Sequence, residues 1–180
     1  LTYLYHLPVA FVPRSLFKPL FIGRYIIMDK TGTITDAEPL EIKIVRVTDC
    51  SANVLKQAIA IELAYGKGSP LIRRSFEKLQ GMLKIKLEDT NINKDAVTFL
   101  HGKGLRAKLE KHDYCIGNER ILQDCIGTFN HTGMSELKLG DQAYHREIYI
   151  VEDGRICYLL LIKEQTRQYF NNFISELGNK

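Results

Sequence analysis

The spacing of hydrophobic residues changes several times along the chain, and each change predicts a different element. Residues 24–28 form a largely apolar run, which predicts a short strand buried on both faces, as in parallel sheets. Residues 41–48, EIKIVRVT, alternate between apolar and polar side chains, which predicts a half-buried strand. An irregular charged segment separates the two strands.

Three further segments have the spacing of helices. Apolar residues recur every three or four positions from 51 to 65, where Ser51 is a suitable N-cap. The loop GKGSP follows, and Pro70 suits the first turn of a second helix that runs to about residue 80. Residues 164–177 have the same spacing and precede Gly178, which predicts a helix near the end of the chain.

Short strands dominate the part of the chain between these helices. Alternation predicts strands at 82–88 and 114–117 and a strand–turn–strand unit at 96–109, with a helix from Asn118 to about residue 125. Two apolar runs flank Asp153-Gly154, a dipeptide typical of two-residue hairpins. A hairpin-rich block between two α/β fragments predicts an α/β fold with an inserted α+β domain, an antiparallel sheet flanked by helices.

Composition and charge narrow the function classes. The chain has 180 residues, of which 45% are hydrophobic and 26% are charged, and the net charge is +4. No block of Lys or Arg stands out, so charge gives no support to a nucleic-acid partner. Prolines and basic residues interrupt the apolar run at 1–27, so the sequence predicts no membrane span there.

The cysteines and histidines give no clear metal signature. Cys50, Cys115, Cys125 and Cys157 form no C-x-x-C pair, which predicts buried free thiols in a reducing compartment. The tightest His/Cys cluster is His112-x-x-Cys115, which has no partner pair at zinc-finger spacing. An ordinary loop and strand pairing is therefore favoured over a metal site for these residues.

The segment DKTGTIT at 29–35 has the parts needed for phosphoryl transfer. Asp29 is a carboxylate that can accept a phosphoryl group, and Gly32 permits close approach of the backbone to phosphate oxygens. Thr31 and Thr33 supply hydroxyl groups, and Lys30 supplies a cation. A shorter D-x-T-G string favours a plain Asx-turn after a strand, whereas the full seven-residue string favours chemistry at Asp29.

DKTGTIT resembles the phosphorylation motif of the P-type ATPases, the cation pumps that form an aspartyl phosphate. The resemblance implies that Asp29 accepts the γ-phosphoryl group of ATP and that Asp29 and Thr31 bind Mg²⁺. Related phosphatases carry an Asp at the position of Thr31 as a general acid and base. The Thr at this position implies a longer-lived acyl phosphate.

Other segments are similar to the heavy-metal-transporting branch of that family. FLHGKGLRAKL resembles the branch's Gly-x-Gly nucleotide loop, with Gly102, Gly104 and Leu105, and YCIGNERIL resembles its Gly-Asn segment, with Gly117 and Asn118. The branch usually has Ser-Glu-His-Pro-Leu before the second inserted helix, where this chain has KGSPL. Gly68 and Ser69 stand in place of the Glu and His that hold the adenine, so the nucleotide site implied at Ser69 is altered.

The resemblance implies a domain organisation and a set of partners. Residues 1–38 and 163–180 would form part of a HAD-like phosphorylation domain, and residues 39–162 would form the inserted nucleotide-binding domain. ATP and Mg²⁺ are the implied cofactors, and the membrane and actuator domains of the pump are the implied partners at the cytoplasmic face of a membrane. The alternative is a degenerate pump-like protein with weak or no ATP binding that acts as a regulatory or interaction module.

Overall fold

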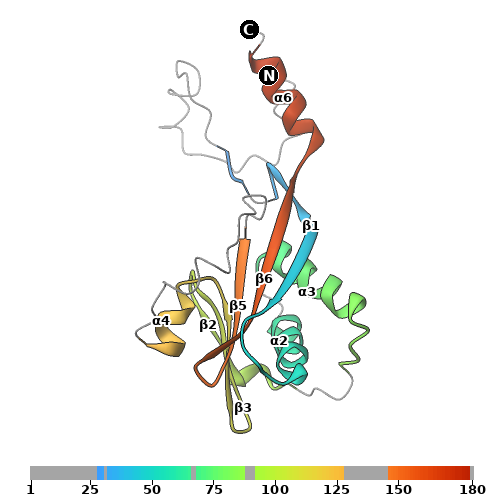
Figure 1. Ribbon diagram of the computed structural model, residues 1–180. Coiled ribbons are helices and arrows are strands. Elements are labelled where there is room, and N and C mark those ends of the chain that lie inside the picture. Colours follow the sequence, from blue (N-terminus) through green and yellow to red (C-terminus); the bar gives the residue numbers. More distant parts are fainter. Residues whose placement is uncertain (1–27, 31, 66–67, 88–91, 128–145, 179–180) are drawn as a thin grey trace. The chain divides into compact units, whose positions relative to one another are not determined.

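The computed structural model describes residues 28–30, 32–65, 68–87, 92–127 and 146–178. The chain divides into two compact units. One unit comprises Leu1–Ala37 and Thr166–Lys180, and the other comprises Glu38–Gln165. The larger unit contains most of the regular structure (Figure 1).

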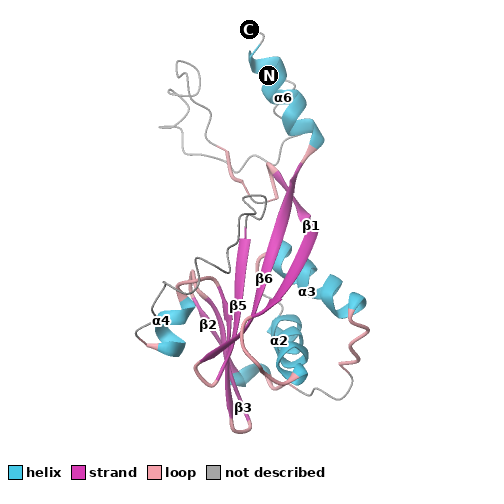
Figure 2. Cartoon of the chain, in the orientation of Figure 1, coloured by secondary structure: helices cyan, strands magenta, loops and turns pink. Residues whose placement is uncertain are grey.

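A six-stranded sheet in the order β1-β6-β5-β4-β3-β2 forms the centre of the larger unit (Figure 2). Each pair from β2 through β6 is antiparallel. The strands are β1 (Thr35–Arg46), β2 (Val97–Leu100), β3 (Gly104–Leu109), β4 (His112–Gly117), β5 (Arg146–Glu152) and β6 (Arg155–Thr166). The prediction of an antiparallel sheet with helices is confirmed.

Helices of the larger unit cover both faces of this sheet. They are α2 (Ala52–Tyr65), α3 (Pro70–Met82) and α4 (Ile121–Ile126), with a short 3₁₀ turn η2 (Lys94–Ala96) before β2, whereas α6 (Gln168–Gly178) belongs to the smaller unit. Buried residues of α2 and α3 form one core cluster with the sheet, and buried residues of α4 form a second. Along β4, Tyr114 and Ile116 join the first cluster, whereas Cys115 joins the second. The alternation of a strand therefore assigns successive side chains to opposite faces.

Local signals predicted several elements correctly. The helices at 51–65 and 70–80 are present as α2 and α3, and the strand–turn–strand unit is present as β2 and β3. β5 and β6 form the expected hairpin, with Asp153 at φ 48° and Gly154 at φ 76°. Positive φ at both central residues is what a type I′ turn requires.

Other predictions at the level of elements are wrong or differ in their bounds. Residues 85–87 form no strand, because α3 continues to Met82 and the following turn ends with a hydrogen bond from Ile85 N–H to the Gln80 carbonyl (3.1 Å). The helix predicted from Asn118 begins at Ile121, and residues 164–166 belong to β6 instead of the last helix. The strand predicted at 24–28 falls mostly outside the described residues.

The expectation of free thiols is also wrong. Disulfides join Cys50 to Cys157 and Cys115 to Cys125, with Cα–Cα distances of 5.6 Å and 6.6 Å. The first pair is 107 positions apart in the sequence. Sequence spacing alone could not bring these residues together, whereas the tertiary structure does.

Within the described residues, no helix is both long and apolar enough to cross a membrane.

Candidate functional site

The loop that carries Asp29 closes as a tight turn at the start of β1. The Lys30 carbonyl accepts hydrogen bonds from the backbone N–H groups of Ile34 (2.9 Å) and Thr35 (3.0 Å) and from the Thr35 hydroxyl (3.3 Å). Gly32 has φ 83°, and its N–H donates to the Thr35 carbonyl at 3.1 Å. The side chain of Asp29 is exposed. Thr31 lies outside the described residues.

The segment that follows β6 holds this loop within the smaller unit. The Tyr169 hydroxyl donates to the Thr33 carbonyl at 2.8 Å, and the Arg167 N–H donates to the Ile34 carbonyl at 2.9 Å. The Arg167 guanidinium forms an ion pair with Asp36 at 3.0 Å. Sequence patterns identified the loop but missed both supporting side chains, since 136 positions separate Thr33 from Tyr169.

The predicted glycine loop lies in the larger unit, between β2 and β3. Gly102 has φ 71° and open space where a Cβ would be, so the turn needs its left-handed conformation. Gly104 and Gly117 face each other across β3 and β4. A Cβ on Gly104 would lie 2.1 Å from the Ile116 carbonyl oxygen, and one on Gly117 would lie 2.1 Å from that of Lys103. Both glycines are therefore required for the close approach of two backbones.

Asn118 ties the end of β4 to this turn. Its side-chain amide donates to the Gly102 carbonyl at 2.8 Å, and its side-chain oxygen accepts from the Arg120 N–H at 3.0 Å. The structure thus places Asn118 beside the glycine loop and uses its side chain to hold that loop. Leu105 directly follows Gly104, but its side chain is only 3% exposed and belongs to the hydrophobic core.

A row of aromatic rings connects the glycine turn to the end of α2. Tyr65 stacks on Phe99 with a centroid distance of 5.8 Å, and Phe99 lies 6.0 Å from His101. Phe99 is 45% exposed. Exposed rings of this kind offer a flat surface on which a planar base can stack. Local sequence patterns do not reveal this row, because Tyr65 comes from α2 whereas Phe99 and His101 come from β2 and the turn after it.

The side chain of Glu62 on α2 lies against the backbone of Gly68, in the segment before α3. Glu62 of α2 is 5% exposed, and its Oε1 lies 2.5 Å from where a Cβ on Gly68 would be. Burial raises the pKa of Glu62 to about 7, and the charge of Arg73 opposes this rise. Ser69 occupies the N-cap position of α3 without a side-chain capping bond, and its carbonyl accepts from the Arg73 N–H at 3.0 Å.

The larger unit thus brings together most of the predicted nucleotide-site residues. Gly102, Gly104, Gly117 and Asn118 form one connected turn, as the hydrogen bonds and register show. Ser69 lies between α2, which carries Glu62 and Tyr65, and the start of α3. Asp29, Lys30 and Thr33 lie in the other unit.

Several solved structures have a fold similar to that of this chain. A zinc-transporting PIB-type ATPase in the E2.Pi state matches with a TM-score of 0.54 and 18% identity, over 83% of this chain and 23% of that one. The chain shares the fold of part of a heavy-metal P-type ATPase. A second structure of a zinc-transporting PIB-type ATPase, in another state, matches with a TM-score of 0.55 and 19% identity, over 84% of this chain and 23% of that one.

A third match is smaller in size than these transporters. It is a structure of the catalytic domain of the CPx-ATPase CopB-B, described in terms of conformational changes upon nucleotide binding. The TM-score is 0.50 with 14% identity, over 84% of this chain and 46% of that one. No family model matches the chain. The chain spans about a quarter of the length of the zinc transporters. At identities of 18% and 19%, the structural likeness shows a shared fold alone.

Proposed function

We propose that this chain is the ATP-binding and phosphorylation region of a P-type ATPase that transports a heavy-metal cation. The observation that carries the proposal is that the glycine turn, the aromatic row and the Glu62 carboxyl all belong to one compact unit, in a chain whose fold is shared with such pumps. We assign residues 39–162 to the nucleotide-binding domain. We assign residues 1–38 and 163–180 to part of a HAD-like phosphorylation domain.

The aromatic row is the proposed platform for the adenine ring. Phe99 is 45% exposed and lies three positions before Gly102, where a Cβ would meet open space. Stacking of a base on an aromatic side chain contributes about 1–3 kcal/mol. The turn is supported by Gly104, Leu105, Gly117 and Asn118. These residues would contact the nucleotide through their backbone groups.

Glu62 is the proposed replacement for the carboxyl group that KGSPL lacks. Its Oε1 already occupies the space beside Gly68 where a side chain from that position would begin. With a pKa of about 7, the carboxyl group is partly protonated at neutral pH and can either donate to a ring nitrogen or accept from an exocyclic amine. Ser69 supplies a hydroxyl at the start of α3 in place of an imidazole.

Asp29 is the proposed phosphoryl acceptor in the longer protein. Its exposed carboxylate directly precedes the turn that is fixed by the Lys30 carbonyl. We assign Lys30, Thr31 and Thr33 to the phosphate oxygens. A carboxylate oxygen is the hard ligand that Mg²⁺ prefers, so Asp29 fits this ion, and Thr31 is its proposed companion ligand. Mg²⁺ would supply charge neutralisation for the transferred group.

The remaining parts of the proposal concern the longer protein. The membrane domain and the actuator domain of the pump are the proposed partners, and the chain is placed at the cytoplasmic face of a membrane.

One observation favours a second candidate, a degenerate pump-like protein that acts as a regulatory or interaction module. The Asn118 side chain already makes one donated and one accepted hydrogen bond inside the protein, so only its second N–H and second lone pair are left for a ligand. With Gly68 and Ser69 in place of Glu and His, fewer side chains at these positions are left for the adenine. Nucleotide affinity separates the two candidates.

An NMR titration of the ¹⁵N-labelled chain with ATP tests the proposal, with GTP and AMP as controls. We expect ATP to shift the amides of Gly102, Gly104 and Asn118, and Phe99→Ala to raise Kd about tenfold, because 1.4 kcal/mol of lost stacking corresponds to that factor. Leu40→Ala is the matched control, since Leu40 is a 50% exposed apolar side chain on β1. No shifts up to millimolar ATP would favour the degenerate module.

A further inference from the structure

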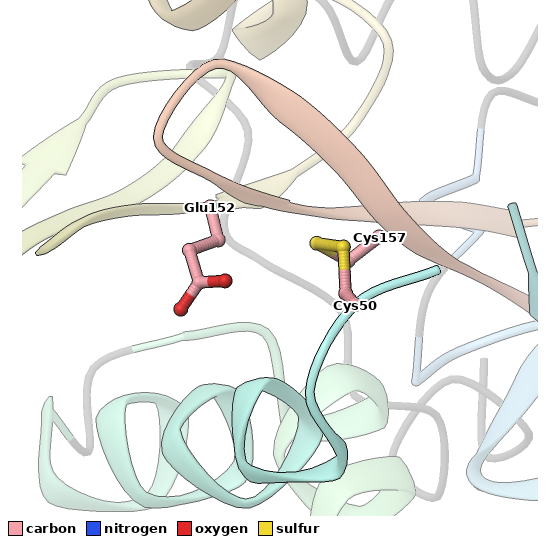
Figure 3. Close-up of side chains that lie close together, drawn as sticks. All are labelled: Cys50, Glu152 and Cys157. Atoms are coloured by element: carbon pink, nitrogen blue, oxygen red, sulfur yellow. A yellow bond between two sulfur atoms is a disulfide. The ribbon is translucent and has the colours of Figure 1, made fainter. Parts of the chain in front are cut away.

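Two cysteines and a carboxylate converge on the side of the sheet that faces α2 (Figure 3). Cys50 comes from the loop between β1 and α2, Glu152 from the end of β5, and Cys157 from β6. One ligand atom of each residue lies within 4.8 Å of the others. The predicted nucleotide and phosphorylation residues include none of the three.

A β-bulge directs Cys157 into this cluster. Ile150 pairs with Tyr158 and Val151 pairs with Ile156, so Cys157 is an extra residue on β6. As a result Cys157 and Tyr158 both belong to the core cluster shared with α2 and α3, whereas Ile156 belongs to the opposite one. Bulges often re-aim a side chain next to a functional site. Here the bulge turns the Cys157 sulfur toward Cys50.

The two sulfurs form a disulfide in this structure, and a metal ion requires them as thiolates. A dithiol reductant would supply two electrons and two protons, giving two thiols here and a disulfide on the reductant. Metal binding would then release the two thiol protons to solvent as the sulfurs become ligands. A reducing compartment favours the dithiol form.

We propose that Cys50, Cys157 and Glu152 form a redox-gated site for a thiophilic divalent cation of the Zn²⁺ type. Zn²⁺ binds sulfur at about 2.3 Å and carboxylate oxygen at about 2.0–2.2 Å. In a tetrahedron these lengths separate the two sulfurs by about 3.8 Å and each sulfur from the oxygen by about 3.5 Å. The three atoms lie within 4.8 Å of one another while the two sulfurs are bonded, so reduction must let the sulfurs move apart to reach this spacing.

Neighbouring groups hold these ligands in place. The Tyr114 hydroxyl hydrogen-bonds to the Glu152 carboxylate, and burial together with this bond raises the pKa of Tyr114. Thr48 Oγ1 lies 3.1 Å from Cys50 Sγ and donates to the Ile156 carbonyl at 2.8 Å. Hydrogen bonds to the ligands are what fix ligand orientation around protein-bound metals.

The cluster is partly accessible to solvent. Cys157 is fully buried, whereas the Glu152 side chain is 20% exposed and Cys50 is partly exposed. An ion can therefore enter past Cys50 and Glu152 and complete its shell with water. Three protein ligands plus one exchangeable position is a common zinc arrangement.

Titration of the 180-residue chain with Co²⁺ after reduction by a phosphine tests the proposal. We expect one Co²⁺ per chain, a thiolate-to-cobalt charge-transfer band, and displacement by Zn²⁺. Before reduction we expect neither the band nor binding. Cys50→Ser should abolish the band, and Glu152→Gln should weaken binding at least tenfold. A reduced chain that binds no Co²⁺ would mean that the pair is a structural disulfide only.

The second cysteine pair provides the matched control. A double variant, Cys115→Ser with Cys125→Ser, should keep the band unchanged. Alkylation of the reduced wild-type chain offers a check that needs no variant, because Zn²⁺ should slow the reaction at Cys50 and leave its rate at Cys125 unchanged. Slower alkylation at Cys125, or a band that survives Cys50→Ser, would overturn the assignment.

Discussion

The buried carboxyl of Glu62 gives the sharpest test of the folded structure. Glu62 is 5% exposed, and burial raises its pKa from 4.5 to about 7. Between these pH values the folded state binds more protons than the unfolded state. The free energy of unfolding must therefore fall as pH rises through this window, and the cost is complete above pH 7.

The size of this cost follows from the two pKa values. One pKa unit corresponds to about 1.4 kcal/mol, so ionisation of Glu62 costs the folded state about 3 kcal/mol at pH 8. At pH 5 the same linkage gives about 1 kcal/mol, because most of the penalty has been relieved by protonation. Glu62→Gln keeps the shape and removes the charge, so it should stabilise the chain by about 2 kcal/mol more at pH 8 than at pH 5.

Urea unfolding followed by far-ultraviolet circular dichroism at pH 5 and pH 8 measures the difference. The matched control is Glu176→Gln, because Glu176 is an exposed helical residue on α6. The control should show the same change in stability at both pH values. If Glu62→Gln also shows no pH-dependent gain, Glu62 is not buried as an ionisable group, and its proposed role near Gly68 fails with it.

Three further predictions concern backbone contacts, the Asp29 loop and a surface ion pair. Gly104→Ala should destabilise the chain by more than about 2 kcal/mol, because its Cβ would lie 2.1 Å from a backbone oxygen, whereas Gly81→Ala inside α3 should stabilise it by about 1 kcal/mol in the same urea assay. Equal effects of the two changes would contradict the close strand approach. Tyr169→Phe should speed hydrogen exchange at the loop around residues 32–35, and unchanged exchange would show that its 2.8 Å bond does not hold the loop. A hydrogen bond with Asp153 raises the pKa of His112, so Asp153→Asn should lower the midpoint of the His112 imidazole titration seen by NMR. An unmoved midpoint would show that this pair does not form in solution.

Several elements could be predicted from the sequence because their signals are local. The Asp153-Gly154 turn, the Pro70 start of α3 and the helical spacing of α2 depend on neighbours within one or two turns of chain. Residues 82–88 show the limit of such reasoning. Their alternation is as regular as that of a strand, but a strand needs a neighbouring strand, and the sheet in the described part of the chain includes none of residues 85–87.

The candidate sites also combine features that the sequence shows with contacts that only the tertiary structure shows. The sequence by itself determined the chemistry offered at Asp29 and at the glycine turn, since residue types and spacing are properties of the chain. Only the tertiary structure placed Glu62 beside Gly68, Phe99 against Tyr65, and Cys50 within bonding distance of Cys157. These contacts join residues on different elements. Their geometry is set by strand pairing, by one bulge and by helix packing, which no local pattern encodes.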